Sequence, residues 1–191
     1  MAVRVVIAED EAIIRLDLKE TLEEEGYEVV GETGRGDEAV ALVKEHGPDL
    51  AILDIKMPGL DGLSAAREIT GERRAAVLIL TAFSQRDLVE RARDAGALAY
   101  LVKPFQRAEL VPAVELAIAR FREMRALEAE IKGLEDELEI RRVVDRAKGM
   151  LTDGHKLSEA DAFAFIQRQA MADRSTMKAT AQRVIDGQLS P

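Results

Sequence analysis

The stretch Ala51-Ile52-Leu53-Asp54-Ile55-Lys56-Met57-Pro58-Gly59 joins an apolar run to a carboxylate and then to a Pro-Gly pair. Because proline and glycine interrupt regular structure, we predict a short buried strand that ends at Asp54 and gives way to a loop. Open parallel sheets bind their ligands beyond the carboxyl ends of the strands, so Asp54 would lie on the floor of a site. Taken alone, Asp54 could equally well begin a turn, and its assignment depends on partners elsewhere in the chain.

Apolar runs of similar length recur on both sides of this stretch and alternate with helical patterns. The expected strands cover residues 3–8, 27–30, 50–53, 77–80 and 98–102. Amphipathic helices are expected between them, with Gly26, Gly47 and Gly96 as stop signals and Ser84 as the N-cap of the last. This alternation predicts an α/β fold with a doubly wound, five-stranded parallel sheet.

Four of the expected strands end in side chains that bear a charge or a hydroxyl group: Glu9 with Asp10, Asp54, Thr81 and Lys103. Right-handed strand–helix–strand connections bring these ends to one edge of the sheet. The carboxylates suit Mg²⁺, and Asp54 would then act as a nucleophile toward a phosphoryl group. Thr81 and Lys103 would bind the phosphoryl oxygens. Considered one at a time, Lys103 could form an ion pair at the end of the sheet and Thr81 could cap a helix. The occurrence of all these residues together favours phosphoryl transfer.

Composition narrows the class of protein. The chain has no cysteine, which excludes disulfides, thiolate zinc sites and cysteine nucleophiles. The apolar N-terminal run is too short for a signal-peptide core or a membrane span, so we expect a cytoplasmic protein that does not enter a membrane. The net charge of -9 lies in residues 1–119, with 14 basic and 23 acidic side chains, whereas residues 120–191 have 13 of each. Residues 120–191 therefore have no net charge, so charge does not argue against binding of nucleic acid by this part of the chain.

An acidic pair follows the first expected strand, an aspartate precedes Met57-Pro58-Gly59, and the chain continues with Asp61-Gly62, Thr81-Ala82 and Lys103-Pro104-Phe105. These motifs give residues 1 to about 118 a resemblance to the receiver domain of two-component response regulators, which has a flavodoxin-like fold. It implies that a sensor histidine kinase phosphorylates Asp54. One departure is Glu9, which stands where many receivers have aspartate. Glutamate carries the same charge as aspartate on a longer side chain, so metal binding is expected to be retained.

The same resemblance assigns roles to other residues at this edge. Mg²⁺ would be held by Glu9, Asp10, Asp54 and the backbone carbonyl of Lys56. Thr81 and Tyr100 would form a switch pair, in which the tyrosine ring turns inward as Thr81 moves toward the phosphoryl group. The Lys103–Pro104 peptide would be cis, a form tolerated essentially only before proline.

A helix is expected to continue well past the receiver. Between Gln106 and Arg142 the only helix breakers are Pro112, which can sit in the first turns, and Gly133. Apolar residues recur there at spacings of three and four: Met124, Leu127, Ile131, Leu134 and Leu138. This spacing predicts a short coiled coil. The alternative is that the stripe packs against the chain's own C-terminal helices.

Three short helices are expected after this long one. The first covers residues 140–151 and is broken by Asp153-Gly154-His155. The second begins after Ser158 as N-cap and runs to Met171, with Phe163, Ile166 and Ala170 facing inward. The third follows Ser175. Such short helices can form a bundle only with help from the long helix.

The C-terminal segment contains Arg146-Ala147-Lys148-Gly149, Ser158-Glu159-Ala160-Asp161-Ala162-Phe163, Gln169-Ala170-Met171, Arg174 and Met177. These motifs give it a resemblance to the ANTAR output domain, whose members bind RNA as antiterminators and often follow receivers. It implies that a homodimer, formed on activation, recognises paired RNA stem-loops. Basic side chains would take the phosphates, while loop bases offer stacking and edge contacts. The candidates for RNA contacts are Arg142, Arg146, Lys148, Gln169, Arg174 and Lys178.

These expectations divide the chain into a receiver (1–118), a coiled-coil-like linker (119–140) and an ANTAR domain (141–191). Phosphorylation would control RNA binding and antitermination, or another form of post-transcriptional regulation. The alternative is a DNA-binding response regulator that acts on transcription initiation, which would need a recognition helix with local positive charge. An enzyme is not expected, because phosphatases with an aspartyl nucleophile commonly need a second acid two residues further on, where this chain has Lys56.

Overall fold

The computed structural model describes residues 2–82 and 86–191. The chain divides into two units, Met1–Arg125 and Ala126–Pro191. None of the helices in the described ranges is long and apolar enough to cross a membrane.

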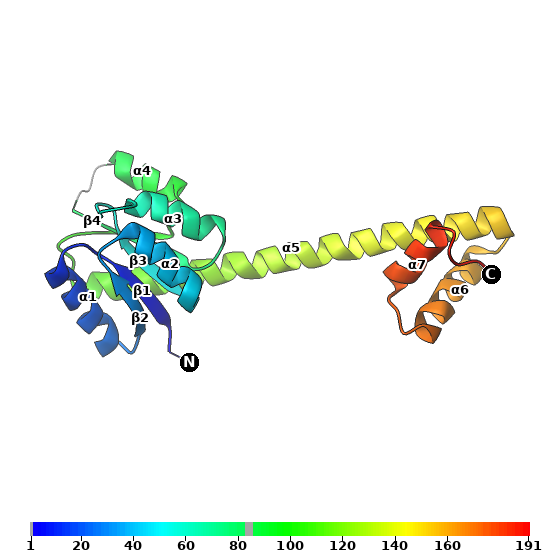
Figure 1. Ribbon diagram of the computed structural model, residues 1–191, viewed down its shortest axis with the longest axis horizontal. Coiled ribbons are helices and arrows are strands. Elements are labelled where there is room, and N and C mark those ends of the chain that lie inside the picture. The colour runs from blue at the N-terminus through cyan, green and yellow to red at the C-terminus, as the bar shows by residue number, and fades with distance from the viewer. Residues whose placement is uncertain (1, 83–85) are drawn as a thin grey trace. The chain divides into compact units, whose positions relative to one another are not determined.

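The first unit is built on a parallel sheet. Its described residues form the strands β1 (Arg4–Ala8), β2 (Glu28–Thr33), β3 (Leu50–Asp54), β4 (Ala76–Thr81) and β5 (Ala99–Val102), hydrogen-bonded in the order β2-β1-β3-β4-β5. The connecting helices are α1 (Ala12–Glu24), α2 (Gly36–His46), α3 (Gly62–Gly71) and α4 (Arg86–Asp94), and α5 (Arg107–His155) follows the last strand (Figure 1). The predicted doubly wound sheet is confirmed.

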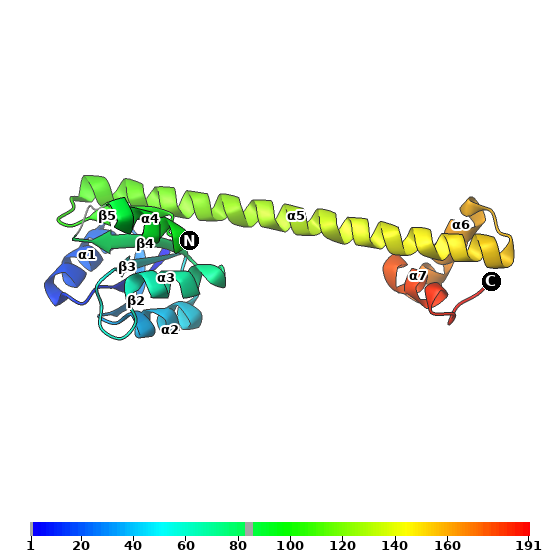
Figure 2. The same ribbon diagram turned by 90° about the horizontal axis from the view of Figure 1, so that it is seen from above.

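Helices cover both faces of the sheet, which explains why its central strands are apolar throughout. Successive side chains of a strand point to opposite faces. Ala51 and Leu53 of β3 pack with α2, α3 and α4, whereas Leu50 and Ile52 pack with α1 and α5 (Figure 2). The decisive apolar run therefore forms part of two cores, one on each side of the sheet.

The element boundaries of the first unit follow the expected signals, with one qualification. Strand β2 continues to Thr33 rather than ending at Val30, because its pairing with β1 extends to the end of that strand. Asp61 caps α3 by accepting a hydrogen bond from the Ser64 N–H at 2.8 Å. The proposed N-cap Ser84 lies outside the described residues.

Helix α5 is a single helix of 49 residues, which corrects the expectation of a separate helix over residues 140–151. The expected break at Asp153-Gly154-His155 is also displaced, since the helix continues to His155. No proline follows Pro112 within this helix, and a glycine in a helix costs only about 1 kcal/mol. Burial of Val144, Ala147 and Leu151 in the C-terminal bundle offsets that cost.

The second unit packs α6 (Glu159–Ala172) and α7 (Met177–Ile185) against the last turns of α5 (Figure 1). Ser158 caps α6 as predicted, since its Oγ accepts a hydrogen bond from the Asp161 N–H. The prediction that Phe163 faces inward is wrong: Phe163 is 44% exposed, and Phe165 is buried instead. Ala162, Phe165 and Ile166 share one helical face, and that face, rather than the overlapping one through Phe163, forms the buried core with α5 and α7.

The apolar stripe of α5 does not pack against the C-terminal helices. Leu127, Ile131, Leu134 and Leu138 are 53 to 56% exposed. The core of the second unit uses Val144, Ala147 and Leu151 further along the same helix. Met124, the first residue of the predicted stripe, is instead half-buried and lines a pocket of the first unit. The part of the stripe from Leu127 to Leu138 is therefore available for contact with another molecule.

Candidate functional site

The order of the strands brings the four polar strand ends side by side. Strands β1, β3, β4 and β5 are consecutive in the sheet. Backbone hydrogen bonds continue just past the strand ends, from Ile55 N to Leu80 O at 3.2 Å and from Lys103 N to Thr81 O at 2.7 Å. This pairing holds the polar side chains of the four strand ends at one edge of the sheet: Glu9 and Asp10 after β1, Asp54 in β3, Thr81 in β4 and Lys103 after β5.

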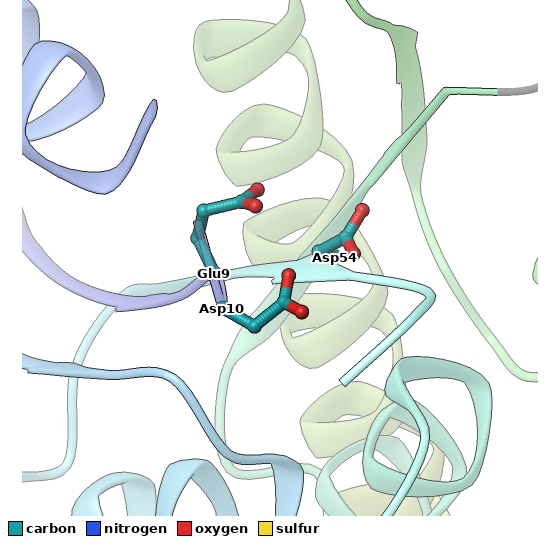
Figure 3. Close-up of side chains that lie close together, drawn as sticks. All are labelled: Glu9, Asp10 and Asp54. Atoms are coloured by element: carbon teal, nitrogen blue, oxygen red, sulfur yellow. The ribbon is translucent and has the colours of Figure 1, made fainter. Parts of the chain in front are cut away.

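Three carboxylates converge at this edge (Figure 3). Glu9, Asp10 and Asp54 each offer an oxygen, and these oxygens lie within 4.8 Å of one another. Glu9 is fully buried and Asp54 is 5% exposed, whereas Asp10 lies at the surface. Three negative charges this close repel one another strongly unless a cation lies among them.

Lys103 supplies part of that compensation. Its Nζ lies 2.6 Å from Glu9 Oε2 and 2.9 Å from Asp54 Oδ1, and its side chain is only 10% exposed. Burial raises the pKa of Glu9, the hydrogen bond with Lys103 lowers it, and repulsion from Asp54 raises it again, with a net rise. Burial alone would lower the pKa of Lys103, but hydrogen bonds with Glu9 and Asp54 outweigh burial and raise it. The ammonium group therefore remains charged beside Asp54.

Backbone groups fix the orientation of the two buried carboxylates. The Lys56 N–H donates to Asp54 Oδ2 at 3.0 Å, and the Glu11 N–H donates to Glu9 Oε1 at 3.3 Å. Arg15 Nη1 donates to the backbone carbonyl of Glu9 at 2.5 Å. Arg15 was not predicted from the sequence, because a contact across a strand–helix turn has no characteristic spacing.

A pocket of about 270 Å³ opens over these groups, lined in part by Asp10, Asp54, Lys56, Thr81 and Lys103. Thr81 is buried and hydrogen-bonds with Tyr100. Burial raises the pKa of Tyr100 more than this hydrogen bond lowers it. The two residues named as a switch pair are thus in contact, and their switching role stays a prediction. The Lys103–Pro104 peptide is cis, as predicted.

The acidic cluster fits a magnesium ion by its chemistry. Mg²⁺ prefers oxygen ligands in an octahedron at about 2.0–2.1 Å, which places pairs of ligand atoms about 3 to 4 Å apart. The three carboxylate oxygens lie within 4.8 Å of one another, so they belong to one cluster of possible ligands. Lys56 lines the same pocket, and the role of its carbonyl as a fourth ligand stays a prediction.

Gly62 holds the backbone of Asp54 in place by its lack of a side chain. Its N–H donates to Ile55 O at 3.0 Å, and a Cβ atom at Gly62 would lie 1.8 Å from Asp54 O and 2.7 Å from Asp54 C. Contacts this short are impossible, so a side chain at this position must displace the backbone that carries Asp54. The Asp61-Gly62 pair was noted in the sequence, but only the structure reveals this contact.

Gly62→Ala is therefore expected to impair chemistry at Asp54 as well as stability. Misplacing a reacting group by about 1 Å costs up to roughly 100-fold in rate, and overpacking costs about 1–3 kcal/mol. The rate of labelling by acetyl phosphate, followed by phosphate-affinity gel, and urea unfolding measure the two effects. Gly71→Ala is the matched control, since nothing lies within 4 Å of a Cβ atom there. Labelling of Gly62→Ala at the wild-type rate would contradict the positioning role.

The six candidates for RNA contacts lie in the second unit but not on one face. Arg142 and Arg146, four residues apart on α5, are exposed and share a face. Lys148 lies on another face, where its Nζ is 3.0 Å from Asp145 Oδ1. Lys178 Nζ pairs with Glu139 Oε2 at 2.8 Å. Gln169 is half-buried in α6, and Arg174 is exposed in the turn before α7. Their contacts with RNA stay predictions.

The fold and the site define the class of protein. Residues 5–115 match the family model of the response regulator receiver domain, and residues 132–185 match that of the ANTAR domain. The chain belongs to the response regulators of two-component systems, with a receiver followed by an ANTAR domain. This family consists of regulators rather than catalysts.

Individual relatives agree with this class. The chain is 60% identical over 183 residues to the transcriptional regulatory protein PdtaR of Mycobacterium tuberculosis (strain ATCC 25618 / H37Rv), covering 96% of this chain and 89% of PdtaR. The receiver domain of the putative response regulator NarL from Mycobacterium tuberculosis matches with a TM-score of 0.60 and 34% identity, over 62% of this chain and 97% of that one. A chain of the CheX-CheY-BeF3-Mg²⁺ complex from Borrelia burgdorferi matches with a TM-score of 0.56 and 29% identity, over 59% and 86%.

Proposed function

We propose that a sensor histidine kinase phosphorylates Asp54 and that this modification controls RNA binding by the ANTAR domain. The observation that carries the proposal is the surroundings of Asp54, which is buried at the edge of the sheet. Asp54 lies beside the charged Lys103 and two further carboxylates, in a pocket that Thr81 also lines. In the transfer, an Asp54 oxygen attacks phosphorus as the bond to the kinase histidine nitrogen breaks. Lys103, already 2.9 Å from Asp54 Oδ1, would neutralise charge on the phosphoryl oxygens, and Thr81 would hydrogen-bond to them.

Mg²⁺ is the cofactor that we propose for this site. Glu9, Asp10, Asp54 and the Lys56 carbonyl would hold it, and the similar chain from Borrelia burgdorferi belongs to a complex that contains BeF3 and Mg²⁺. Bound there, the ion would relieve the repulsion among the carboxylates and neutralise charge on the phosphoryl group. Glu9 already pairs with Lys103, so its side chain, longer than that of aspartate, would bind both the Lys103 ammonium group and the Mg²⁺ ion.

Dimerisation is the proposed link between the two domains. We infer that the receiver (1–118) controls pairing of the linker (119–140), whose apolar stripe is exposed, and that pairing places two ANTAR domains (141–191) for two stem-loops. Phosphorylation can bias this equilibrium only by its preference for the dimer-competent form. The regulatory outcome that we propose is transcription antitermination or another post-transcriptional effect, and the match to the ANTAR family favours it over binding to DNA.

The proposal is tested by comparing stem-loop RNA with duplex DNA, each with and without acetyl phosphate and Mg²⁺. We expect RNA affinity to rise roughly 5- to 150-fold on phosphorylation, the usual range of coupling between two sites. RNA binding should weaken with salt, because phosphate contacts release counterions. Equal RNA affinity in both states would overturn the switch. Preference for duplex DNA would instead support a regulator of transcription initiation.

A further inference from the structure

The C-terminal unit leaves one aromatic ring outside its core. Residues 126–191 contain only two aromatic residues, Phe163 and Phe165. Phe165 is buried in the bundle, whereas Phe163, two residues earlier on α6, is 44% exposed. In α6, the core of the bundle uses Ala162, Phe165 and Ile166. Packing of that core therefore does not explain why an aromatic side chain is present at position 163.

Phe163 forms one wall of a pocket of about 330 Å³. Ile140 and Val144 of α5 and Met177 of α7 supply the other apolar surfaces. This volume lies at the small end of the range for ligand pockets, which suits a single flat heterocycle. All the lining residues belong to the second unit, so the pocket is complete within that unit.

Two basic side chains, Arg141 and Lys148, line the same pocket together with two acidic ones, Glu137 and Asp145. Arg141 is 82% exposed and lies 3.9 Å from Asp145, an exposed ion pair of the kind that contributes little to stability. Lys148 lies 3.0 Å from Asp145, and this hydrogen bond raises the pKa of Lys148, which keeps the ammonium charged. Lys148 also lies 3.8 Å from Glu159. Phosphate groups can therefore replace or join Asp145 as a partner of Arg141, and Asp145 and Glu159 as partners of Lys148. Asp145 itself can accept a hydrogen bond from an amino group of a base.

We propose that the Phe163 pocket binds one unstacked base of an RNA loop, with the base stacked on the ring and the adjacent phosphates beside Arg141 and Lys148. The inference rests on the proposed RNA-binding function and names a site for it. Bases splayed out from loops are commonly stacked on aromatic side chains, and every base has a face that can stack. Neither Phe163 nor Arg141 was among the RNA contacts predicted from the sequence.

The test uses hairpin RNA enriched on the phosphorylated wild-type protein from a pool with a fixed stem and a randomised loop. Phe163→Leu keeps an apolar side chain without the ring and is expected to bind this RNA roughly 5- to 150-fold more weakly, the range of one lost stacking contact. Met150→Ala is the matched control: Met150 is similarly exposed, lies on α5 and does not line the pocket. It should bind within about twofold of wild type, the effect of an ordinary surface substitution.

A second variant reports stacking directly. The chain has no tryptophan, so Phe163→Trp introduces a single fluorescent indole at the pocket. Its emission should be quenched by the hairpin and not by the stem alone as a blunt duplex, and circular dichroism checks that both Phe163 variants are folded.

The outcomes separate the proposed function from the base-binding site. Failure of the wild-type protein to enrich any hairpin would overturn the proposed function and this site with it. Wild-type binding with unchanged affinity of Phe163→Leu, or equal quenching by hairpin and duplex, would overturn the site alone. Loss of the dimer in Phe163→Leu, measured by light scattering, would assign the ring to contact between two copies and likewise overturn the site.

Discussion

Asp54→Asn is expected to abolish labelling of the protein by acetyl phosphate or by a kinase. The amide is not a nucleophile toward phosphorus, and removing a nucleophile costs at least about a thousandfold in rate. The fold should survive, because asparagine has nearly the same shape and its amide oxygen can still accept the hydrogen bond from the Lys56 N–H. The measurement is incorporation of ³²P, or mass spectrometry of the intact protein, over a time course in Mg²⁺.

Asp61→Asn is the matched control for this experiment. Asp61 is a nearby exposed aspartate that caps α3, and asparagine is an equally good N-cap. It should be labelled at close to the wild-type rate. Continued uptake of label by Asp54→Asn would mean that another group accepts the phosphate, and the proposed switch would lose its basis.

Replacing both Ile131 and Leu134 with glutamate is expected to keep the phosphorylated protein monomeric. Both side chains are more than half exposed in a single chain, so the substitutions should not disturb its fold. In a paired coiled coil they would be buried, and burying an unpaired carboxylate costs several kcal/mol. We therefore expect dimerisation at least about a thousandfold weaker, with loss of cooperative binding to two stem-loops. Light scattering with and without acetyl phosphate measures the mass.

Glu135→Gln controls for the change of charge on the same helix, since Glu135 lies outside the apolar stripe. This variant should dimerise as the wild type does. If the double variant still forms a dimer on phosphorylation, the stripe is not the interface. If the wild-type protein is monomeric in both states, dimerisation is not the link between the domains.

The α/β fold class was predictable because short apolar runs alternate with amphipathic segments along the sequence. Runs such as residues 50–53 can be buried in a parallel sheet when the amphipathic segments form helices that cover both of its faces. The set of groups at the candidate site was predictable for a related reason. Parallel strands present their carboxyl ends at one edge, so Glu9, Asp54 and Lys103 were expected at the same edge once the sheet was assumed.

Contacts between elements were not predictable in this way. No sequence pattern indicated that Lys103 lies between Glu9 and Asp54, or that Gly62 packs against the backbone of Asp54. These contacts depend on the order and register of strands that are distant in the chain. Short spacings along the sequence do not specify such long-range geometry.

The sequence by itself determined which segments are helix and strand in the receiver and which side chains end its strands. Only the tertiary structure decided which of two overlapping faces of α6 is buried, so that Phe163 is exposed, and whether α5 continues past residue 140. Both depend on packing partners: a helical pattern allows several faces and several ends, and the burial of Phe165 and Ala147 in one bundle selects among them.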